Sequence, residues 1–286
     1  MSIQNAKGYW FGGVHPSKRQ NPSVFNTGQI LKGMMALYRY TGDDSFMDSA
    51  LRGARWLAQG VGDDGLWPSN DYQSKETPSY YTHVAWPMLE VWKECGEAGI
   101  RDAAERFLRV VLQRRRDNGV FMGWGFNEHR PAFTHTIAYT LRGMQESARL
   151  LDAWDEYGVS TKIALNVLMR KAELAGGGLP GAFDNDWKAS GKYVCLTGNA
   201  QLATCLLILE SHESDLRIVN SAAKLVDYVC KKQLQYIPIA GIRGGIAGSF
   251  PVWGRYMAMR FPNWAAKYHC DALLALMQRV EQLRQA

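Results

Sequence analysis

Apolar and polar residues follow two kinds of helical pattern in alternation along most of the chain. In the first kind, apolar residues cover most of the helix circumference, as in a helix that is buried on several sides. In the second kind, apolar residues recur with the 3.6-residue period and charged residues occupy the opposite face. The first pattern covers residues 27–40, 82–95, 134–151, 197–211 and 263–280, and the second covers 43–58, 101–115, 159–174 and 215–231. The sequence therefore predicts about five inner and four outer helices.

An uncharged polar residue opens each predicted inner helix. The copies are Thr27-Gly28-Gln29, Thr82-His83-Val84, Thr134-His135-Thr136, Thr197-Gly198-Asn199 and the weaker Asn263-Trp264-Ala265. Thr and Asn are good N-caps because their side-chain oxygens accept hydrogen bonds from free backbone N–H groups of the first turn. A degenerate repeat of about 50 to 65 residues is typical of stacked or ringed helical units. We therefore expect the Thr residues to cap the inner helices.

Gly-rich loops lie between each outer helix and the next inner one. Asp64-Gly65 and Asn118-Gly119 are turn formers because they tolerate positive φ. Alternating helices with long loops at one end predict an all-α fold, an α/α toroid whose inner helices line a central funnel. We predict a single domain over residues 1–286, with residues 1–22 as an extended lead-in lying on it. The loops and the inner-helix N-termini should then meet at one rim.

Composition narrows the classes of partner. The 286 residues carry a formal net charge of +6, which permits an anionic ligand but does not prove one. The densest basic run, Arg114 to Arg116, ends a predicted helix, where cations offset the helix dipole, so no nucleic-acid binding is predicted. No run approaches the length of a membrane span. The N-terminus shows no signal peptide, which predicts a cytoplasmic protein, or a periplasmic one if an export signal has been removed.

Cysteine usage argues against a metal or a disulfide framework. The five Cys form no C-x-x-C pair, which indicates reduced thiols. His269, Cys270 and Asp271 are consecutive on a predicted helix, so their side chains point in different directions and do not share one tetrahedral ion. No phosphate-binding or dinucleotide fingerprint appears. The sequence predicts no metal and no cofactor, and it leaves the oligomeric state open.

Several segments resemble known toroidal proteins. The pattern Gln-x-x-x-Asp followed by Gly and an aromatic residue, beginning at Gln59 and Gln113, resembles the terpenoid-cyclase/prenyltransferase toroid superfamily and, more distantly, toroidal polysaccharide lyases and epimerases. Residues 195–201, 242–256 and 262–267 resemble VpsJ-like proteins of bacterial exopolysaccharide and capsule clusters. The resemblance implies an α/α toroid and a polysaccharide context, but no settled reaction. Isoprenoid chemistry is disfavoured because Asp184-Asn185-Asp186-Trp187 lacks the last Asp of the cyclase motif.

The two histidines that follow a repeat Thr are the first catalytic candidates. His83 and His135 occupy equivalent places on neighbouring inner helices, and Tyr139 lies one turn beyond His135. An imidazole or a phenol of tuned pKa moves protons near neutral pH. We therefore predict an enzyme of exopolysaccharide metabolism that binds an anionic oligo- or polysaccharide and performs lyase-type elimination or epimerisation at a uronate. The alternative is that both histidines are structural and donate to loop carbonyls.

Two further functions stay open. A glycoside hydrolase would need two carboxylates flanking the glycosidic oxygen. Asp184 and Asp186 are candidates because Phe183 and Trp187 bracket them, and an aromatic neighbour raises a carboxyl pKa. The other possibility is a non-catalytic glycan-binding accessory protein. The predicted sugar-binding residues are Gln29, Tyr81, Trp86, Glu128, His129, Trp187, Asn199, Arg243, Trp253, Tyr256, Arg260, Asn263, Trp264 and Lys267.

Overall fold

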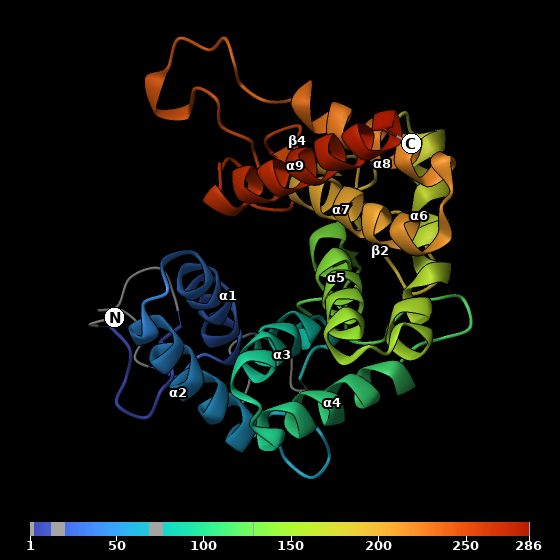
Figure 1. The fold of residues 1–286 in the computed structure, drawn as a ribbon. Coiled ribbons are helices and arrows are strands. Elements are labelled where there is room, and N and C mark those ends of the chain that lie inside the picture. The colour runs from blue at the N-terminus through green and yellow to red at the C-terminus, as the bar shows by residue number, and fades with distance from the viewer. Residues whose placement is uncertain (1–2, 13–20, 69–76, 128, 286) are drawn as a thin grey trace. The chain divides into compact units, whose positions relative to one another are not determined.

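The structure is a computed structural model that describes residues 3–12, 21–68, 77–127 and 129–285, and within them it is mostly helical (Figure 1). The described residues form nine α-helices: α1 (Val24–Thr41), α2 (Asp44–Gly60), α3 (Thr82–Cys95), α4 (Ala98–Gln113), α5 (Thr134–Leu151), α6 (Lys162–Leu174), α7 (Leu196–Glu213), α8 (Leu216–Cys230) and α9 (Asn263–Gln285). Each corresponds to one of the predicted segments, so the all-α prediction is confirmed. The ends differ by a few residues, as at α6, which a π turn and a 3₁₀ turn precede.

Four two-residue strands lie in the loops that lead into the helices. They are β1 (Ala132–Phe133), β2 (Ala182–Phe183), β3 (Val194–Cys195) and β4 (Ser249–Phe250). The first pairs antiparallel with the second, and the third with the fourth. Two of these strands run directly into α5 and α7, so they fix the direction in which those helices begin.

The chain forms two compact units. One contains Met1–Arg116, Phe121–Asn127 and Gly143–Ser160, and the other contains Asp117–Val120, Glu128–Arg142 and Thr161–Ala286. The boundary falls within α5, whose first half belongs to the second unit. The single domain over residues 1–286 stays a prediction.

In the first unit, helices of the same kind are neighbours. α1 packs on α3 and α2 packs on α4, while each outer helix also packs on its own inner partner. Leu31, Leu57 and Phe107 are fully buried at these contacts. The lead-in is tied down here, because the N–H of Trp10 donates to Thr27 Oγ1 over 3.0 Å and Gln4 donates to the Ser49 carbonyl over 2.9 Å.

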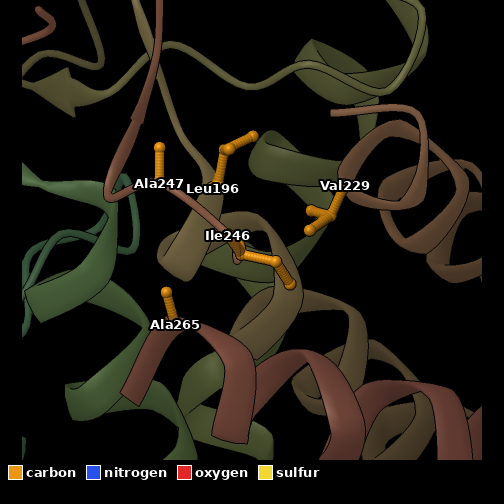
Figure 2. Packing of buried hydrophobic residues seen from close by; sticks show 5 residues of the cluster. All are labelled: Leu196, Val229, Ile246, Ala247 and Ala265. Carbon is orange, nitrogen blue, oxygen red and sulfur yellow. The ribbon is translucent and has the colours of Figure 1, made fainter. Parts of the chain in front are cut away.

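In the second unit, α7 is buried over most of its length and packs against α6, α8 and α9. A hydrophobic cluster gathers Leu196, Val229, Ile246, Ala247 and Ala265 from α7, α8, α9 and the loop between α8 and α9 (Figure 2). The Glu210 carboxylate is fully buried and receives two hydrogen bonds of 2.6 Å from the guanidinium of Arg279. This pair joins α7 to α9 because a buried charge needs its partner.

The prediction that the repeat Thr residues cap the inner helices is wrong for three of them. The N-caps are Ser23, Tyr81 and Cys195, and the repeat Thr follows inside each helix. Thr27 and its counterparts at 82, 134 and 197 are fully buried. Two of the hydroxyls bind other segments: Thr27 accepts from Trp10, and Thr134 donates to the Pro180 carbonyl over 2.6 Å.

The repeat marks close helix contacts rather than caps. A Cβ added at Gly28 would lie 2.7 Å from Val84 Cγ1, and one added at Gly198 would lie 2.8 Å from the His135 backbone nitrogen. No real Cβ fits at such distances, because packed interiors leave no spare volume. The small residue after Thr therefore lets α1 approach α3 and lets α7 approach α5.

Candidate functional site

The second unit places His135 in the first turn of α5, next to Gln201 of α7. Its Nδ1 lies 2.8 Å from Gln201 Oε1. An amide oxygen only accepts hydrogen bonds, so Nδ1 carries the proton and donates it to this bond. In the neutral imidazole, Nε2 then holds the free lone pair. The pairing with Gln201 therefore selects the tautomer in which Nε2 is the basic atom.

Burial keeps this imidazole uncharged. His135 is only 4% exposed, and desolvation lowers its pKa from 6.5 to about 4, although the hydrogen bond that it donates to Gln201 acts in the opposite direction. The side chain is thus neutral at physiological pH. It can accept a proton from a bound molecule, and once protonated it is a strong acid that returns the proton readily.

Three tyrosine rings surround His135. The ring centroids of Tyr139, Tyr256 and Tyr268 lie 4.2, 4.9 and 6.4 Å from that of the imidazole. The Tyr268 hydroxyl donates to the Tyr139 hydroxyl over 3.2 Å, and burial raises the pKa of Tyr268 to about 12. The Tyr256 hydroxyl accepts from the indole N–H of Trp264 over 3.0 Å. The site thus combines a neutral base with the buried phenol of Tyr268, whose raised pKa keeps its proton in place at neutral pH.

Each member of this cluster is positioned by its own element. His135 and Tyr139 share a face of α5 because they are four residues apart. The absence of a side chain at Gly198 lets α7 bring Gln201 within reach of α5. Tyr256 comes from the loop before α9, where Ser249 Oγ donates to its carbonyl over 2.7 Å. The candidates Tyr139, Tyr256, Trp264 and His135 thus lie together.

Sequence reasoning missed Gln201 and Tyr268. Each lies on an inner helix about one turn after a predicted site residue or repeat position: Gln201 four residues after Thr197, and Tyr268 four residues after Trp264. Helical spacing alone does not say which face of α7 or α9 turns toward His135. The sequence therefore showed the place of each residue along its helix, but not the residue that it would contact.

The first unit contains a similar pair. The Nδ1 of His83 lies 3.0 Å from Gln29 Oε1, and Gln29 Nε2 donates to the His83 carbonyl over 2.9 Å. The amide oxygen of Gln29 therefore faces the ring of His83, and its amide nitrogen binds the backbone of the same residue. The rings of His83 and Trp86 meet edge to face at 5.2 Å. His83 and His135 each have their own glutamine, and their action as one acid–base set stays a prediction.

Trp86 and Tyr81 lie in packed surroundings of the first unit. The Trp86 indole donates to Glu90 Oε1 over 3.0 Å, and the Lys32 ammonium lies 4.0 Å above its ring. Tyr81 is fully buried, with the Trp67 ring centroid 5.9 Å away. These contacts support a packing role for Tyr81, whereas Trp86 sits beside the His83 ring.

Asp184 and Asp186 lie in a turn after β2. The Oδ1 of Asp184 accepts from the backbone N–H groups of Asp186 and Lys188, over 3.0 and 2.8 Å, as in an Asx turn. Trp187 is buried, and its indole donates to the Asn118 carbonyl over 2.9 Å. Asp186 is exposed. These bonds support a turn-forming role for Asp184.

The remaining candidates divide by exposure. Asn199 is fully buried and donates to the Gly177 carbonyl over 2.7 Å, which ties α7 to the Gly-rich loop. Arg243 donates to the carbonyls of Ile237 and Pro238, and Lys267 forms an ion pair with Asp271. The exposed candidates are His129, Arg243, Trp253, Arg260, Asn263 and Lys267. Glu128 lies outside the described residues.

The described residues offer no ready metal site and no membrane span. No three His, Cys, Asp or Glu side chains among residues 3–12, 21–68, 77–127 and 129–285 gather around a point where an ion could bind. Within the same ranges, every helix is too short or too polar to cross a bilayer.

Comparison with known proteins shows the fold. No protein-family model matches the chain, and no curated protein matches its sequence. Among solved structures it is similar to cellobiose 2-epimerase from Spirochaeta thermophila, with 15% identity, a TM-score of 0.74 and coverage of 98% of this chain and 77% of the other. A D-mannose isomerase gives 13% identity, a TM-score of 0.73 and coverage of 98% and 78%.

A third similar structure is the unsaturated glucuronyl hydrolase of Bacillus sp. GL1, responsible for the degradation of glycosaminoglycan. It gives 19% identity, a TM-score of 0.70 and coverage of 88% of this chain and 74% of the other. These are α/α-toroid carbohydrate enzymes, so the predicted α/α toroid is confirmed. At such identities the likeness concerns the fold, and the chemistry must be argued from the site.

Proposed function

We propose that this protein is a carbohydrate-active enzyme that moves a proton on a bound sugar through His135, in an epimerisation or a lyase-type elimination at a uronate. The observation that carries the proposal is the neutral imidazole of His135, with Nδ1–H held by Gln201 and tyrosine rings around it. Abstraction of a proton from carbon requires an uncharged base that is held in a fixed orientation.

Such a reaction needs a base, a hydrogen-bond donor for the oxyanion and a proton that returns to the product. Nε2 of His135 takes the proton from the carbon next to the sugar carbonyl or carboxylate, and the electron pair moves onto that oxygen. The Tyr139 hydroxyl, which accepts the proton of the Tyr268 hydroxyl, donates its own proton to the oxyanion and stabilises it. In epimerisation a proton returns to the opposite face of the carbon. In elimination the pair expels the oxygen at the neighbouring carbon, and that oxygen takes a proton.

Two observations outside the site support a sugar substrate. The similar structures include a cellobiose 2-epimerase and a D-mannose isomerase, whose names describe rearrangement at sugar carbons. The segments 195–201 and 242–256, which resemble exopolysaccharide proteins, contribute Gln201 and Tyr256 to the cluster. The exopolysaccharide context and the uronate are therefore part of the proposal.

Hydrolysis is the second candidate, because glucuronyl hydrolases are also similar in structure. It would need a pair of carboxylates, and Asp184 is already engaged in its own turn. A non-catalytic glycan-binding role is the third possibility.

The test is incubation in D₂O with reducing oligosaccharides and with uronate polysaccharides, followed by NMR and ultraviolet absorbance. Two results would support the proposal. Epimerisation gives a new epimer that carries deuterium at the carbon next to the carbonyl or carboxylate, and elimination gives a shorter product that absorbs in the ultraviolet because this carbon has lost its proton to a double bond. His135→Ala should abolish either result, while His212→Ala, at the exposed end of α7, should not. Shorter products that have gained water without deuterium at carbon would establish hydrolysis instead, and binding without any turnover would favour the accessory role.

A further inference from the structure

The segment between α8 and α9 carries a concentration of positive charge. Residues 228–270 contain six Lys and Arg and no Asp or Glu, whereas the whole chain has 33 basic and 27 acidic residues. The net charge of +6 therefore originates in this one stretch. In Figure 1 its first part is the orange segment that extends from the helices between α8 and β4. Such a local field favours anionic ligands.

The second part of this segment is a closely held loop. Ile246 and Ala247 belong to the hydrophobic cluster of Figure 2, and Val252 and Phe261 pack against it. The N–H of Met259 donates to the Val252 carbonyl over 2.8 Å, which closes the loop on itself. Because its base is anchored on α7, α8 and α9, the loop presents its side chains in a fixed arrangement.

The loop points two aromatic side chains in different directions. Tyr256 is buried and stacks near the His135 ring, at 4.9 Å between centroids. Trp253, three residues earlier, is 72% exposed. Exposing an indole of this size brings no folding energy, since the hydrophobic gain comes from burial. The loop therefore holds a flat aromatic surface in solvent, three residues from the tyrosine that contacts the His135 ring.

Two exposed arginines lie close to Trp253 in the loop. Arg255 follows Trp253 by two residues, and Arg260 lies next to the Met259–Val252 hydrogen bond that also adjoins Trp253. Both are exposed, and neither forms an ion pair with any other described residue. By contrast, Lys231 and Lys267 in the same stretch pair with Asp227 and Asp271. Arginine suits the planar recognition of carboxylates.

The backbone of the loop is strained. Met257 and Met259 have φ values of 51° and 56°, a region that L-residues rarely occupy. Each such residue costs about 1–3 kcal/mol and is typically found at binding and catalytic sites. The strained path turns Tyr256 inward while Trp253 and the two arginines stay outside.

We propose that Trp253, Arg255 and Arg260 form a subsite that binds an anionic sugar ring of an oligosaccharide, next to the ring that reaches His135. The indole stacks on the apolar face of the pyranose, and the guanidinium groups bind its carboxylate. The inference rests on the proposed function for the location of the reacting ring. It adds that the substrate is an acidic chain of at least two sugars.

The test is titration calorimetry of the full chain with a tetrasaccharide of alternating uronate and neutral sugars. The matched ligand is the same tetrasaccharide with its carboxyl groups reduced to alcohols. We expect the acidic form to bind at least about fivefold more tightly, with a preference that weakens as salt screens the charges. Trp253→Ala should weaken binding of both forms at least about fivefold, because it removes the stacking surface. The double variant R255Q/R260Q should remove the preference for the acidic form.

Two control variants test specificity. Tyr236→Ala removes another aromatic side chain of the same stretch, 95% exposed, and should leave binding unchanged. R217Q/R284Q removes two exposed arginines outside the stretch and should keep the preference. Equal binding of the two ligands, no binding of either, or the same loss in Tyr236→Ala as in Trp253→Ala would overturn the subsite. Trp253→Phe and circular dichroism show whether a loss reflects stacking or misfolding.

The outcomes separate this inference from the proposed function. If His135→Ala abolishes turnover while Trp253→Ala leaves binding unchanged, the subsite is refuted and the proposed catalytic function is supported. If Trp253→Ala weakens binding but no sugar is turned over by the unmodified protein, the subsite stands and the catalytic proposal is refuted.

Discussion

The Nδ1 of His135 lies 2.8 Å from Oε1 of Gln201, so a residue of the next inner helix along the chain selects the tautomer of this histidine. The bond joins α5 to α7 inside one compact unit. Since burial also lowers the histidine pKa to about 4, the base is both oriented and uncharged. The consequences for activity, pH dependence and stability follow from this arrangement and are testable.

Gln201→Leu should lower turnover by about 10- to 100-fold, because Nδ1–H loses its acceptor and the tautomer is no longer selected. The unsatisfied donor should also lower the free energy of unfolding by about 1–3 kcal/mol. Gln201→Glu should instead raise the histidine pKa, since a carboxylate favours the imidazolium. The measurement is the pH profile of kcat/KM. An acidic limb that stays in place in Gln201→Glu would contradict the role of Gln201.

Stability should fall as the pH is lowered from about 6.5 toward 4. The pKa of His135 is lower in the folded protein, so the unfolded chain binds more protons below 6.5 and folding loses free energy there. The loss approaches about 3 kcal/mol near pH 4. Burial lowers the pKa of His269 as well, which acts in the same direction.

Urea unfolding at pH 7.5 and pH 5 measures this difference. In His135→Asn the difference should shrink, while in His212→Asn, whose side chain is exposed, it should match the unmodified protein. An unchanged difference in His135→Asn would show that His135 does not titrate as its burial implies.

Tyr268→Phe should remove the hydroxyl that donates to Tyr139 while keeping the ring in place. We expect turnover to fall about tenfold, because the Tyr139 hydroxyl loses the hydrogen bond that strengthens its own donation to the oxyanion, and stability to fall by about 0.5–1.5 kcal/mol. A double-mutant cycle with Tyr139→Phe measures the coupling between the two hydroxyls. Strictly additive losses would show that the two phenols do not act as a pair.

Gly198→Ala should destabilise the second unit. The new Cβ would lie 2.8 Å from both the His135 nitrogen and the Thr134 carbonyl carbon, and these backbone atoms move only with their helix. Overpacking of this kind costs about 1–3 kcal/mol. Gly33→Ala in α1 is the matched control, because its Cβ meets nothing within 4 Å and alanine favours helix by up to about 1 kcal/mol. Thermal unfolding that is unchanged in Gly198→Ala would argue against close α5–α7 packing.

Amphipathic periodicity was sufficient to predict the helices. The 3.6-residue spacing of apolar positions depends on local geometry, so α2, α4 and α8 could be located without knowledge of their neighbours. The repeated Thr positions likewise predicted a ringed helical fold. His135 and Tyr139 could be paired for the same reason, since both lie on one helix.

The contacts between elements could not be predicted in this way. Thr27 and Thr197 are not caps, because Ser23 and Cys195, which precede them in the chain, occupy the N-caps of α1 and α7. The proximity of Gln201 and Tyr268 to His135 depends on which faces of α7 and α9 pack toward this histidine. Burial, the histidine tautomer and its lowered pKa depend on atoms far apart in the chain. A local pattern carries no information about such distances, so these properties arise from packing.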